Sequence, residues 1–103
     1  MDAELACLDG RIAPSVETLI PVTDEGLLRG DGVFEVVRVY DGVPFALDRH
    51  LDRLERSLHN LRLGHDAARA GLEAWASELL AERGRAFDGC LRIVVTRGGR
   101  RLL

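Results

Sequence analysis

The sequence predicts an α+β domain, an antiparallel sheet with two helices packed on one side of it. Two extended segments come first, and each is followed by an Asp-Gly pair, at positions 9–10 and 41–42. Two stretches with apolar residues at helical spacing come next, and a β-branched apolar run follows them. Because 103 residues support one modest core, a single domain is expected over residues 1–103.

The first hairpin is expected at the N-terminus. Residues 4–8 read as a strand and residues 11–14 as its return, with Asp9 and Gly10 as the turn. An Asp-Gly pair favours a type I′ turn, because both central residues of that turn need positive φ. A short apolar run at 19–22 leads into residues 23–32, which are expected to form a glycine-rich loop.

The second hairpin contains the clearest strand. Residues 33–40 are rich in β-branched and aromatic side chains, Asp41 and Gly42 supply the turn, and residues 43–47 return. Pro44 has no backbone N–H to donate, so it fits an edge strand or the start of a strand.

The first helix is indicated by leucines that recur at steps of four and three residues. These leucines are Leu47, Leu51, Leu54, Leu58 and Leu61. Asp48 is the expected N-cap, and Gly64 is the expected C-terminal stop.

The second helix is expected to begin near Asp66 and to end at Gly84. Its apolar face consists of Leu72, Trp75, Ala76, Leu79 and Leu80. Residues 90–96 then read as a strand, residues 97–101 as a loop, and residues 102–103 as the opening of a further strand. Since that last apolar run has no polar tail, we expect the sequence to be a truncated piece.

The composition is that of an ordinary globular protein and narrows the function classes. All fourteen basic residues are arginines, so a lysine Schiff base cannot form within the chain. Seventeen acids give a net charge of −3, which argues against nucleic-acid binding. No apolar run is long enough for a membrane span, and the acidic start at residues 1–4 argues against a secretory signal, so a cytoplasmic protein is expected. Cys7 and Cys90 are expected to be buried free thiols, and no metal site is expected.

One flank of the first helix carries polar side chains beside the leucine stripe. His50, Arg53 and Ser57 fall together on it, and Arg53 could hold a phosphate or a carboxylate there. The alternative is a solvated face on which Arg53 pairs with a neighbouring acid of the same helix. Those acids are Asp48, Asp52 and Glu55.

The strand at 33–40 places an acid among valines. Glu35 shares one face with Val33 and Val37, so it must either face solvent or be buried with a partner. Phe34 occupies the other face, where the pattern alone favours a core residue.

Two long motifs carry a family resemblance. Residues 24–45, DEGLLRGDGVFEVVRVYDGVPF, and residues 47–57, LDRHLDRLERS, are strongly similar to the start of class IV (fold type IV) pyridoxal-phosphate-dependent aminotransferases. Residues 96–100, TRGGR, resemble the loop that ends the small domain in the lyase-like and D-amino-acid-like members. The family includes branched-chain aminotransferases, D-amino acid transaminases and aminodeoxychorismate lyases, and the resemblance covers nearly the whole chain.

The resemblance assigns expected roles to single residues. Arg53 occupies the position whose arginine binds the cofactor phosphate, and Phe34 occupies the position whose aromatic lines the substrate pocket. Arg29 lies where relatives often carry an aromatic, which leaves the substrate open. Arg97 and Arg100 are candidates for substrate carboxylate or loop contacts.

The resemblance also implies a site that this chain only partly supplies. Glu35 and His50 are interpreted as support for the site, and no catalytic residue is expected here. The Schiff-base lysine would lie in a larger C-terminal domain, so residues 1–103 would be the N-terminal small domain and inactive alone. The complete enzyme would be a homodimer that binds pyridoxal 5′-phosphate and acts on amino acids and 2-oxo acids, with branched-chain-like specificity. An aminodeoxychorismate lyase fragment and a non-catalytic stand-alone interaction domain remain alternatives.

Overall fold

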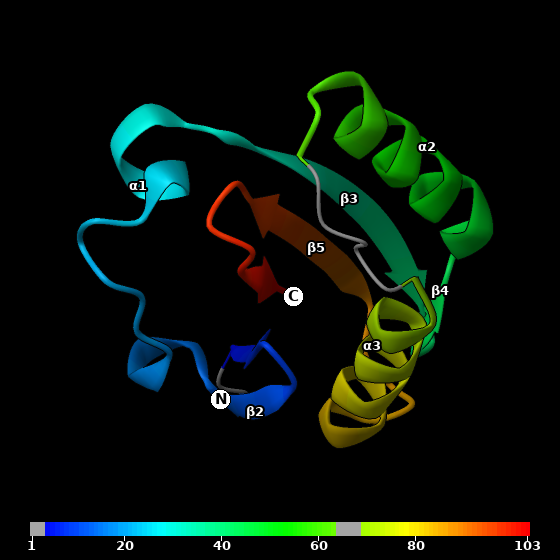
Figure 1. Ribbon diagram of the computed structural model, residues 1–103. Coiled ribbons are helices and arrows are strands. Elements are labelled where there is room, and N and C mark those ends of the chain that lie inside the picture. The colour runs from blue at the N-terminus through cyan, green and yellow to red at the C-terminus, as the bar shows by residue number, and fades with distance from the viewer. Residues whose placement is uncertain (1–3, 64–68) are drawn as a thin grey trace.

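The fold is one six-stranded sheet with helices, as predicted. A computed structural model describes residues 4–63 and 69–103 (Figure 1). The strand order is β2-β1-β6-β5-β3-β4, and every neighbouring pair is antiparallel. The expected α+β class is therefore confirmed.

The first hairpin agrees with its expected turn chemistry. β1 (Leu5–Leu8) pairs with β2 (Arg11–Pro14), and a short 3-10 turn, η1 (Ser15–Glu17), follows. Asp9 and Gly10 have φ of 51° and 94°, the positive values that a type I′ turn requires.

The expected loop at 23–32 is wrong in its centre, where a short helix forms. The helix α1 (Glu25–Arg29) begins after Asp24, whose side chain accepts a hydrogen bond from the Gly26 backbone at 2.8 Å. Gly30 ends the helix in the left-handed region, with φ of 63°. A capping acid before the helix and a glycine after it therefore stabilise a helix of one turn.

The second hairpin is also confirmed, but its return strand, expected over residues 43–47, ends at Pro44. β3 (Gly32–Tyr40) turns through Asp41 and Gly42, both at positive φ, into β4 (Val43–Pro44). β4 lies at one edge of the sheet. Pro44 lacks a backbone N–H, and at this edge no hydrogen bond of the ladder is lost because of it.

The helix α2 (Leu47–Asn60) lies along β3 and buries three of the five predicted leucines: Leu51, Leu54 and Leu58. The predicted Asp48 cap is wrong. The helix starts after Ala46, which has φ of 56° and makes no side-chain cap. Leu61 follows the last helical residue and is half exposed. The predicted stop at Gly64 lies outside the described residues.

The helix α3 (Arg69–Arg83) completes the core and packs against β1. It buries Leu72, Ala76, Leu79 and Leu80, while Trp75 is partly buried. Gly84 was expected to end this helix, and it follows the helix with φ of 99°, a positive value that favours glycine. The start predicted near Asp66 lies outside the described residues.

The last two strands occupy the middle of the sheet. β5 (Gly89–Thr96) pairs with β3 along its length, and β6 (Arg101–Leu102) lies between β5 and β1. β6 therefore confirms the further strand that was expected near the end of the sequence.

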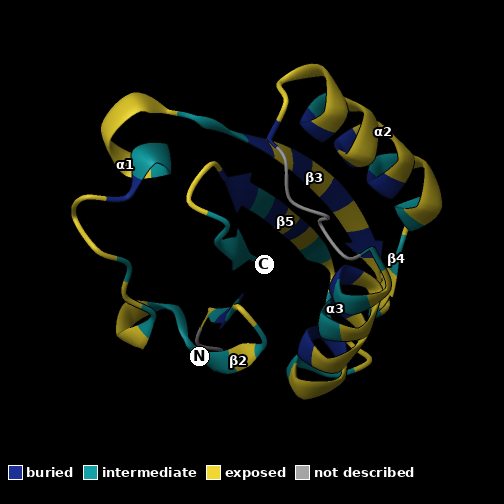
Figure 2. Ribbon diagram, viewed as in Figure 1, coloured by how far each residue is buried: buried dark blue, intermediate teal, exposed yellow. Residues whose placement is uncertain are grey.

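The two faces of the sheet differ in what covers them. On β3, buried residues alternate with exposed ones, which Figure 2 shows as dark blue and yellow bands. The buried face packs on the leucines of α2 and α3 in one core cluster. The opposite face, called here the open face, carries Phe34, Val36, Arg38 and Tyr40 of β3 and Cys90 and Arg92 of β5.

The cysteines illustrate the difference between the faces. Cys7 is buried in the core, as expected, but Cys90 is exposed, so the prediction of a buried Cys90 is wrong.

In the described part of the chain, none of the helices combines the length and apolar character that crossing a membrane requires.

The α2–β3 contact gives a test of the core. Leu54→Ala should lower the free energy of unfolding by about 2–5 kcal/mol, because it leaves a cavity among fully buried side chains. Leu61→Ala is the matched control and should change it by less than about 0.5 kcal/mol, since Leu61 is half exposed. Urea unfolding measures both, and equal losses would contradict the packing described here.

Candidate functional site

A buried carboxylate joins β3 to α2 at the centre of the candidate site. The side chain of Glu35 is 6% exposed and lies among the valines of the core face. Arg53 donates to both of its oxygens, from Nε at 3.1 and 2.9 Å and from Nη2 at 2.7 Å. His50 Nδ1 lies 2.7 Å from Oε1 and donates to it when Glu35 is ionised. The sequence left two alternatives for Glu35, exposure to solvent or burial with a partner. The structure shows the second, since Glu35 is buried with Arg53 and His50 as partners.

The helix brings the two donors to the same carboxylate. His50 and Arg53 are three residues apart, so they lie on neighbouring positions of one flank of α2. The hydrogen bonds from Arg53 hold the pKa of Glu35 below its usual range, and His50 acts in the same direction, whereas burial opposes them. Glu35 in turn raises the pKa of Arg53. The pair is therefore ionised over the physiological range of pH.

Arg53 remains accessible although one edge of its guanidinium is fixed. Its side chain is 64% exposed, and no described residue accepts a hydrogen bond from its Nη1. A planar guanidinium held on one edge presents its remaining N–H groups in a defined direction. Such a group is suited to binding an anion.

The alternative pairing of Arg53 with acids of its own helix is wrong, because those acids have another partner. Arg69, at the start of α3, contacts Asp52, Glu55 at 2.7 Å and Glu73 at 3.0 Å, and it donates to the Asp48 carbonyl at 3.1 Å. This network joins α2 to α3 on the surface and leaves Arg53 to Glu35.

Phe34 lies on the open face and is 64% exposed, so the interpretation as a core residue is wrong. The Arg92 guanidinium lies 6.0 Å from the centre of its ring. Because neighbouring residues of a strand point to opposite faces, Phe34 and the Glu35–Arg53 pair lie on opposite sides of β3.

Two predicted arginines attach the β5–β6 turn to α1, at both ends of that helix. Arg97 Nε contacts the Asp31 carboxylate, and the Arg97 N–H donates to the Asp31 carbonyl at 2.9 Å. Arg100 Nε lies 2.8 Å from Asp24 Oδ2 with its N–H not aligned on that oxygen, so the contact is an ion pair. We call these two pairs the α1 clasp.

Arg29 makes a local contact within α1. Its Nε lies 3.1 Å from Glu25 Oε2, and its side chain is 75% exposed. The structure therefore does not bring the five predicted residues into one cluster: Arg53 pairs with β3, Phe34 lies on the open face, and Arg29, Arg97 and Arg100 belong to α1 or its clasp.

The match to a family model decides what the chain is related to. The model described as "Amino-transferase class IV" matches residues 32–102, which include β3, α2 and β5. The chain belongs to the class IV aminotransferase family.

Class IV relatives agree in sequence and in fold. A D-alanine aminotransferase from Bacillus licheniformis is 37% identical over 90 residues, which are 87% of this chain and 31% of that protein. The structure of 4-amino-4-deoxychorismate lyase from Pseudomonas aeruginosa superposes with a TM-score of 0.77 at 34% identity, over 95% of this chain and 38% of that one. A hypothetical aminotransferase from Mycobacterium tuberculosis in its PLP-bound form gives 0.77 at 29% identity, over 97% and 38%. The chain spans about a third of the length of the curated class IV relatives that it matches.

Sequence reasoning missed Asp24, which has several roles in this class IV domain. Its side chain is 1% exposed, caps α1, accepts from Thr96 Oγ1 at 3.4 Å and pairs with Arg100. A Cβ at Gly26 would lie 2.4 Å from Thr96 Cγ2, so α1 and the end of β5 approach closely. The available signal was an N-cap residue before a short apolar pair and a glycine.

No group of three or more metal-ligating side chains occurs in residues 4–63 and 69–103.

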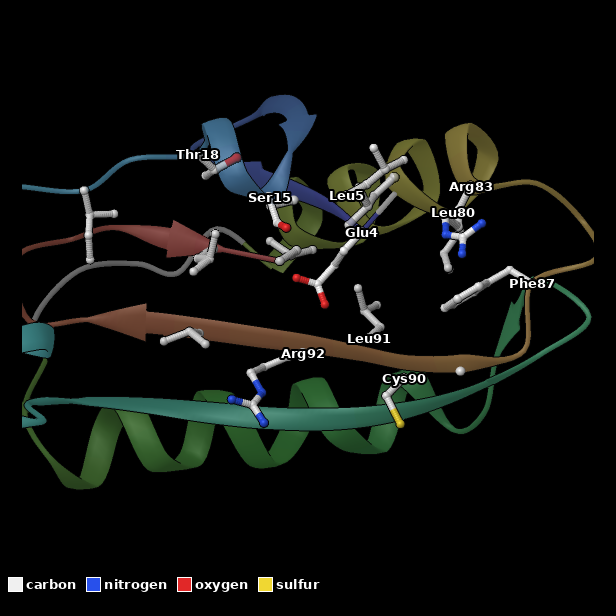
Figure 3. Close-up of a pocket in the computed structure, with 17 residues that line it drawn as sticks. Glu4, Leu5, Ser15, Thr18, Leu80, Arg83, Phe87, Cys90, Leu91 and Arg92 are labelled. Atoms are coloured by element: carbon white, nitrogen blue, oxygen red, sulfur yellow. The ribbon is translucent and has the colours of Figure 1, made fainter. Parts of the chain in front are cut away.

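A cavity of about 850 Å³ lies between β1, β5 and α3 (Figure 3), and it is lined by none of the residues predicted for the site. The candidate site therefore lies outside this cavity, with the accessible guanidinium of Arg53 on one side of β3 and Phe34 of the open face on the other.

The buried carboxylate makes stability depend on pH. The pKa of Glu35 is lower in the folded than in the unfolded state, so its stabilisation is complete above the ordinary value of about 4.3. That stabilisation is lost as the pH falls through the lowered folded value. Glu35→Gln should cost about 1 kcal/mol or more at pH 7, and the difference from wild type should shrink below about pH 4.

Urea unfolding across that range measures the difference. Glu25→Gln is the control, since its pair with Arg29 is exposed and contributes little. A wild-type advantage over Glu35→Gln that stayed constant into acid would contradict the assigned pairing.

Proposed function

We propose that residues 1–103 form the small N-terminal domain of a pyridoxal-phosphate-dependent class IV aminotransferase acting on amino acids and 2-oxo acids. The observation that carries this proposal is the accessible Arg53 guanidinium fixed on one edge by buried Glu35. Family membership and the PLP-bound relative support it. On this proposal the longer polypeptide works as a homodimer in the cytoplasm.

The residues present fit one part of the cofactor, its phosphate. A phosphate dianion accepts charge-assisted hydrogen bonds, and the free edge of Arg53 supplies donors of that kind. Glu35 and His50 are positioning residues, because they orient the guanidinium without facing the ligand themselves. One arginine cannot satisfy a whole phosphate, so the other donors must come from outside these residues.

The chain holds no group that could carry the cofactor covalently. Pyridoxal phosphate, when bound, supplies an electron sink for the electrons released at the substrate α-carbon. The amine that holds it must be a lysine, and residues 1–103 contain none. A C-terminal domain carrying that lysine is thus part of the proposal.

The open face is the proposed wall of the substrate pocket. Phe34 presents an exposed aromatic ring there, which is suited to an aliphatic side chain and favours branched-chain-like substrates. Among the candidate carboxylate contacts, Arg100 is the best placed, because buried Asp24 anchors its Nε and its side chain is 32% exposed. Arg97 and Arg29 are already paired with Asp31 and Glu25, and we assign them secondary roles.

An aminodeoxychorismate lyase is the second candidate. The lyase from Pseudomonas aeruginosa has a closely similar fold, and Arg53, Glu35 and Phe34 serve either reaction. A non-catalytic interaction domain is the third candidate, and it alone requires the polypeptide to contain no more than these residues.

The function is tested on the polypeptide as its source makes it. An intact mass well above 11.3 kDa is expected, together with transfer of the amino group from L-leucine or L-valine to 2-oxoglutarate. Preference for D-alanine would correct the substrate class, and release of pyruvate from aminodeoxychorismate would favour the lyase. A mass of 11.3 kDa with no bound cofactor would leave only the interaction domain.

The role of Arg53 gives a separate test. Arg53→Ala should weaken cofactor binding about ten- to a hundred-fold, because it removes a charge-assisted contact to the phosphate. Arg56→Ala, an exposed arginine on the same helix, is the matched control and should leave the Kd unchanged. Titration of the apoenzyme with pyridoxal phosphate measures both, and equal Kd values for Arg53→Ala and wild type would remove the assignment.

A further inference from the structure

The buried carboxylate of Asp24 serves two elements that are far apart in the sequence. Its Oδ1 accepts the Gly26 N–H at 2.8 Å and so caps the start of α1. Its Oδ2 accepts from Thr96 Oγ1 at 3.4 Å and lies 2.8 Å from Arg100 Nε, at the turn that joins β5 to β6. Because only 1% of the side chain is exposed, its charge depends on these contacts rather than on water.

The helix α1 has few other sources of stability. It contains five residues, none of them buried, so it adds no side chain to the core. An isolated helix of this length is unstable, because the first turn costs more free energy than its few hydrogen bonds return. The surface pair of Arg29 and Glu25 contributes little. The cap at Asp24, the left-handed Gly30 and the α1 clasp therefore hold the helix together.

Two glycines let α1 and the turn share one carboxylate. A Cβ at Gly98 would lie 3.2 Å from Asp24 Oδ2. A Cβ at Gly26 would lie 2.4 Å from Thr96 Cγ2. Side chains at these positions would crowd the turn away from α1. The start of the helix and Arg100 thus meet at the same buried group, and neither can shift without disturbing the other.

Arg100 is fixed at one end of its guanidinium and free at the other. Its Nε is buried against Asp24, whereas no described residue accepts a hydrogen bond from its two terminal nitrogens. A guanidinium held at Nε presents its Nη pair in one direction, and that pair matches the two oxygens of a carboxylate. The buried Glu35 fixes Arg53 in a similar manner.

We propose that Asp24 is a positioning residue that couples the folding of α1 to carboxylate binding at Arg100. The inference rests on the proposed function in one respect, the assignment of Arg100 to a substrate carboxylate. When α1 is formed, Asp24 is buried and holds Arg100 in place for the ligand. When α1 unwinds, Asp24 enters water and Arg100 loses its anchor. Because the coupling free energy is the same in both directions, a bound carboxylate also stabilises α1.

Hydrogen exchange measures the coupling in the polypeptide as its source makes it, loaded with pyridoxal phosphate. The probe is isocaproate, which is leucine without its amino group and therefore binds without reacting. Saturating isocaproate should slow the exchange of the amides at 26–31 about five-fold or more, because it stabilises the formed helix against local opening. The amides of η1, which lie outside α1 and its clasp, are the control and should exchange at an unchanged rate.

Substitutions separate positioning from a merely structural role, with calorimetry to measure the Kd for isocaproate. Asp24→Asn keeps an oxygen to cap α1 but removes the charge that holds Arg100, so the Kd should rise about ten-fold. Arg100→Ala should raise it at least as much. The double variant should bind no more weakly than Arg100→Ala alone, since Asp24 acts through Arg100. Losses that multiply in the double variant overturn the positioning role.

Arg101→Ala is the matched control for Arg100→Ala. Arg101 follows Arg100 directly, but its Nε lies 3.7 Å from the Asp9 carboxylate, away from Asp24. The Kd for isocaproate should therefore stay unchanged in this variant. An equal loss in Arg101→Ala and Arg100→Ala would show that the turn, rather than the Asp24–Arg100 pair, carries the effect, and would overturn the proposal.

Gly30 gives the reciprocal test. Its φ of 63° is unfavourable for a residue with a Cβ, and a Cβ there would meet no other part of the described chain within 4 Å. Gly30→Ala should therefore weaken α1 alone and raise the Kd about three-fold or more, although it touches neither Asp24 nor Arg100. Gly30→Asn tolerates the left-handed conformation and should stay within about two-fold of wild type. An unchanged Kd in Gly30→Ala overturns the coupling even if Asp24→Asn does not fold.

The outcomes keep this inference apart from the proposed function. A protein that transaminates but whose α1 amides do not respond to isocaproate overturns the coupling alone. A protein that responds in α1 but transfers no amino group overturns the proposed function and supports the coupling. Absence of isocaproate binding to the wild type overturns the assignment of Arg100 to a carboxylate, and the coupling with it.

Discussion

The buried carboxylate of Glu35 is the constraint on which the arrangement of β3 and α2 depends. An unpaired carboxylate in this core would be strongly destabilising, so the helix must present donors to it. Arg53 and His50 meet that need from one flank of α2 while its leucines fill the core. The polar and the apolar requirement therefore fix the same rotation of the helix about its axis. What remains exposed of Arg53 is then held in place by the core itself.

The elements set by local chemistry were predictable from the sequence. Both Asp-Gly turns have the positive φ angles that their type demands, and the leucine spacing identified α2 because a helical stripe repeats within a few residues. The short helix α1 was not recognised, because one turn between glycines resembles a loop until its cap is identified. Ala46 likewise replaces the expected Asp48 at the helix start, since the hairpin delivers the chain there in a left-handed conformation.

The candidate site was predictable only in part, because its contacts join distant segments. Alternation showed that Phe34 and Glu35 lie on opposite faces of β3, but the period of two does not say which face meets the helices. The apolar character of Phe34 favoured the core, yet the core received the acid and its partners. The partner of Arg53 could not be chosen among nearby acids until Arg69 was seen to engage the acids of α2.

The α1 clasp and the strand order of the sheet share a consequence for the order of folding. The clasp joins Asp31 to Arg97 and Asp24 to Arg100, pairs that are 66 and 76 positions apart along the chain. A ribosome makes α1 long before it makes the turn that holds it, and the middle of the sheet is made after both of its flanks. During synthesis, the edge of β1 that pairs with β6 therefore stays unpaired until β6 has been made. β5 and β6 then complete the sheet by entering between strands that already exist. Such non-local pairing slows folding and prolongs the exposure of unpaired strand edges.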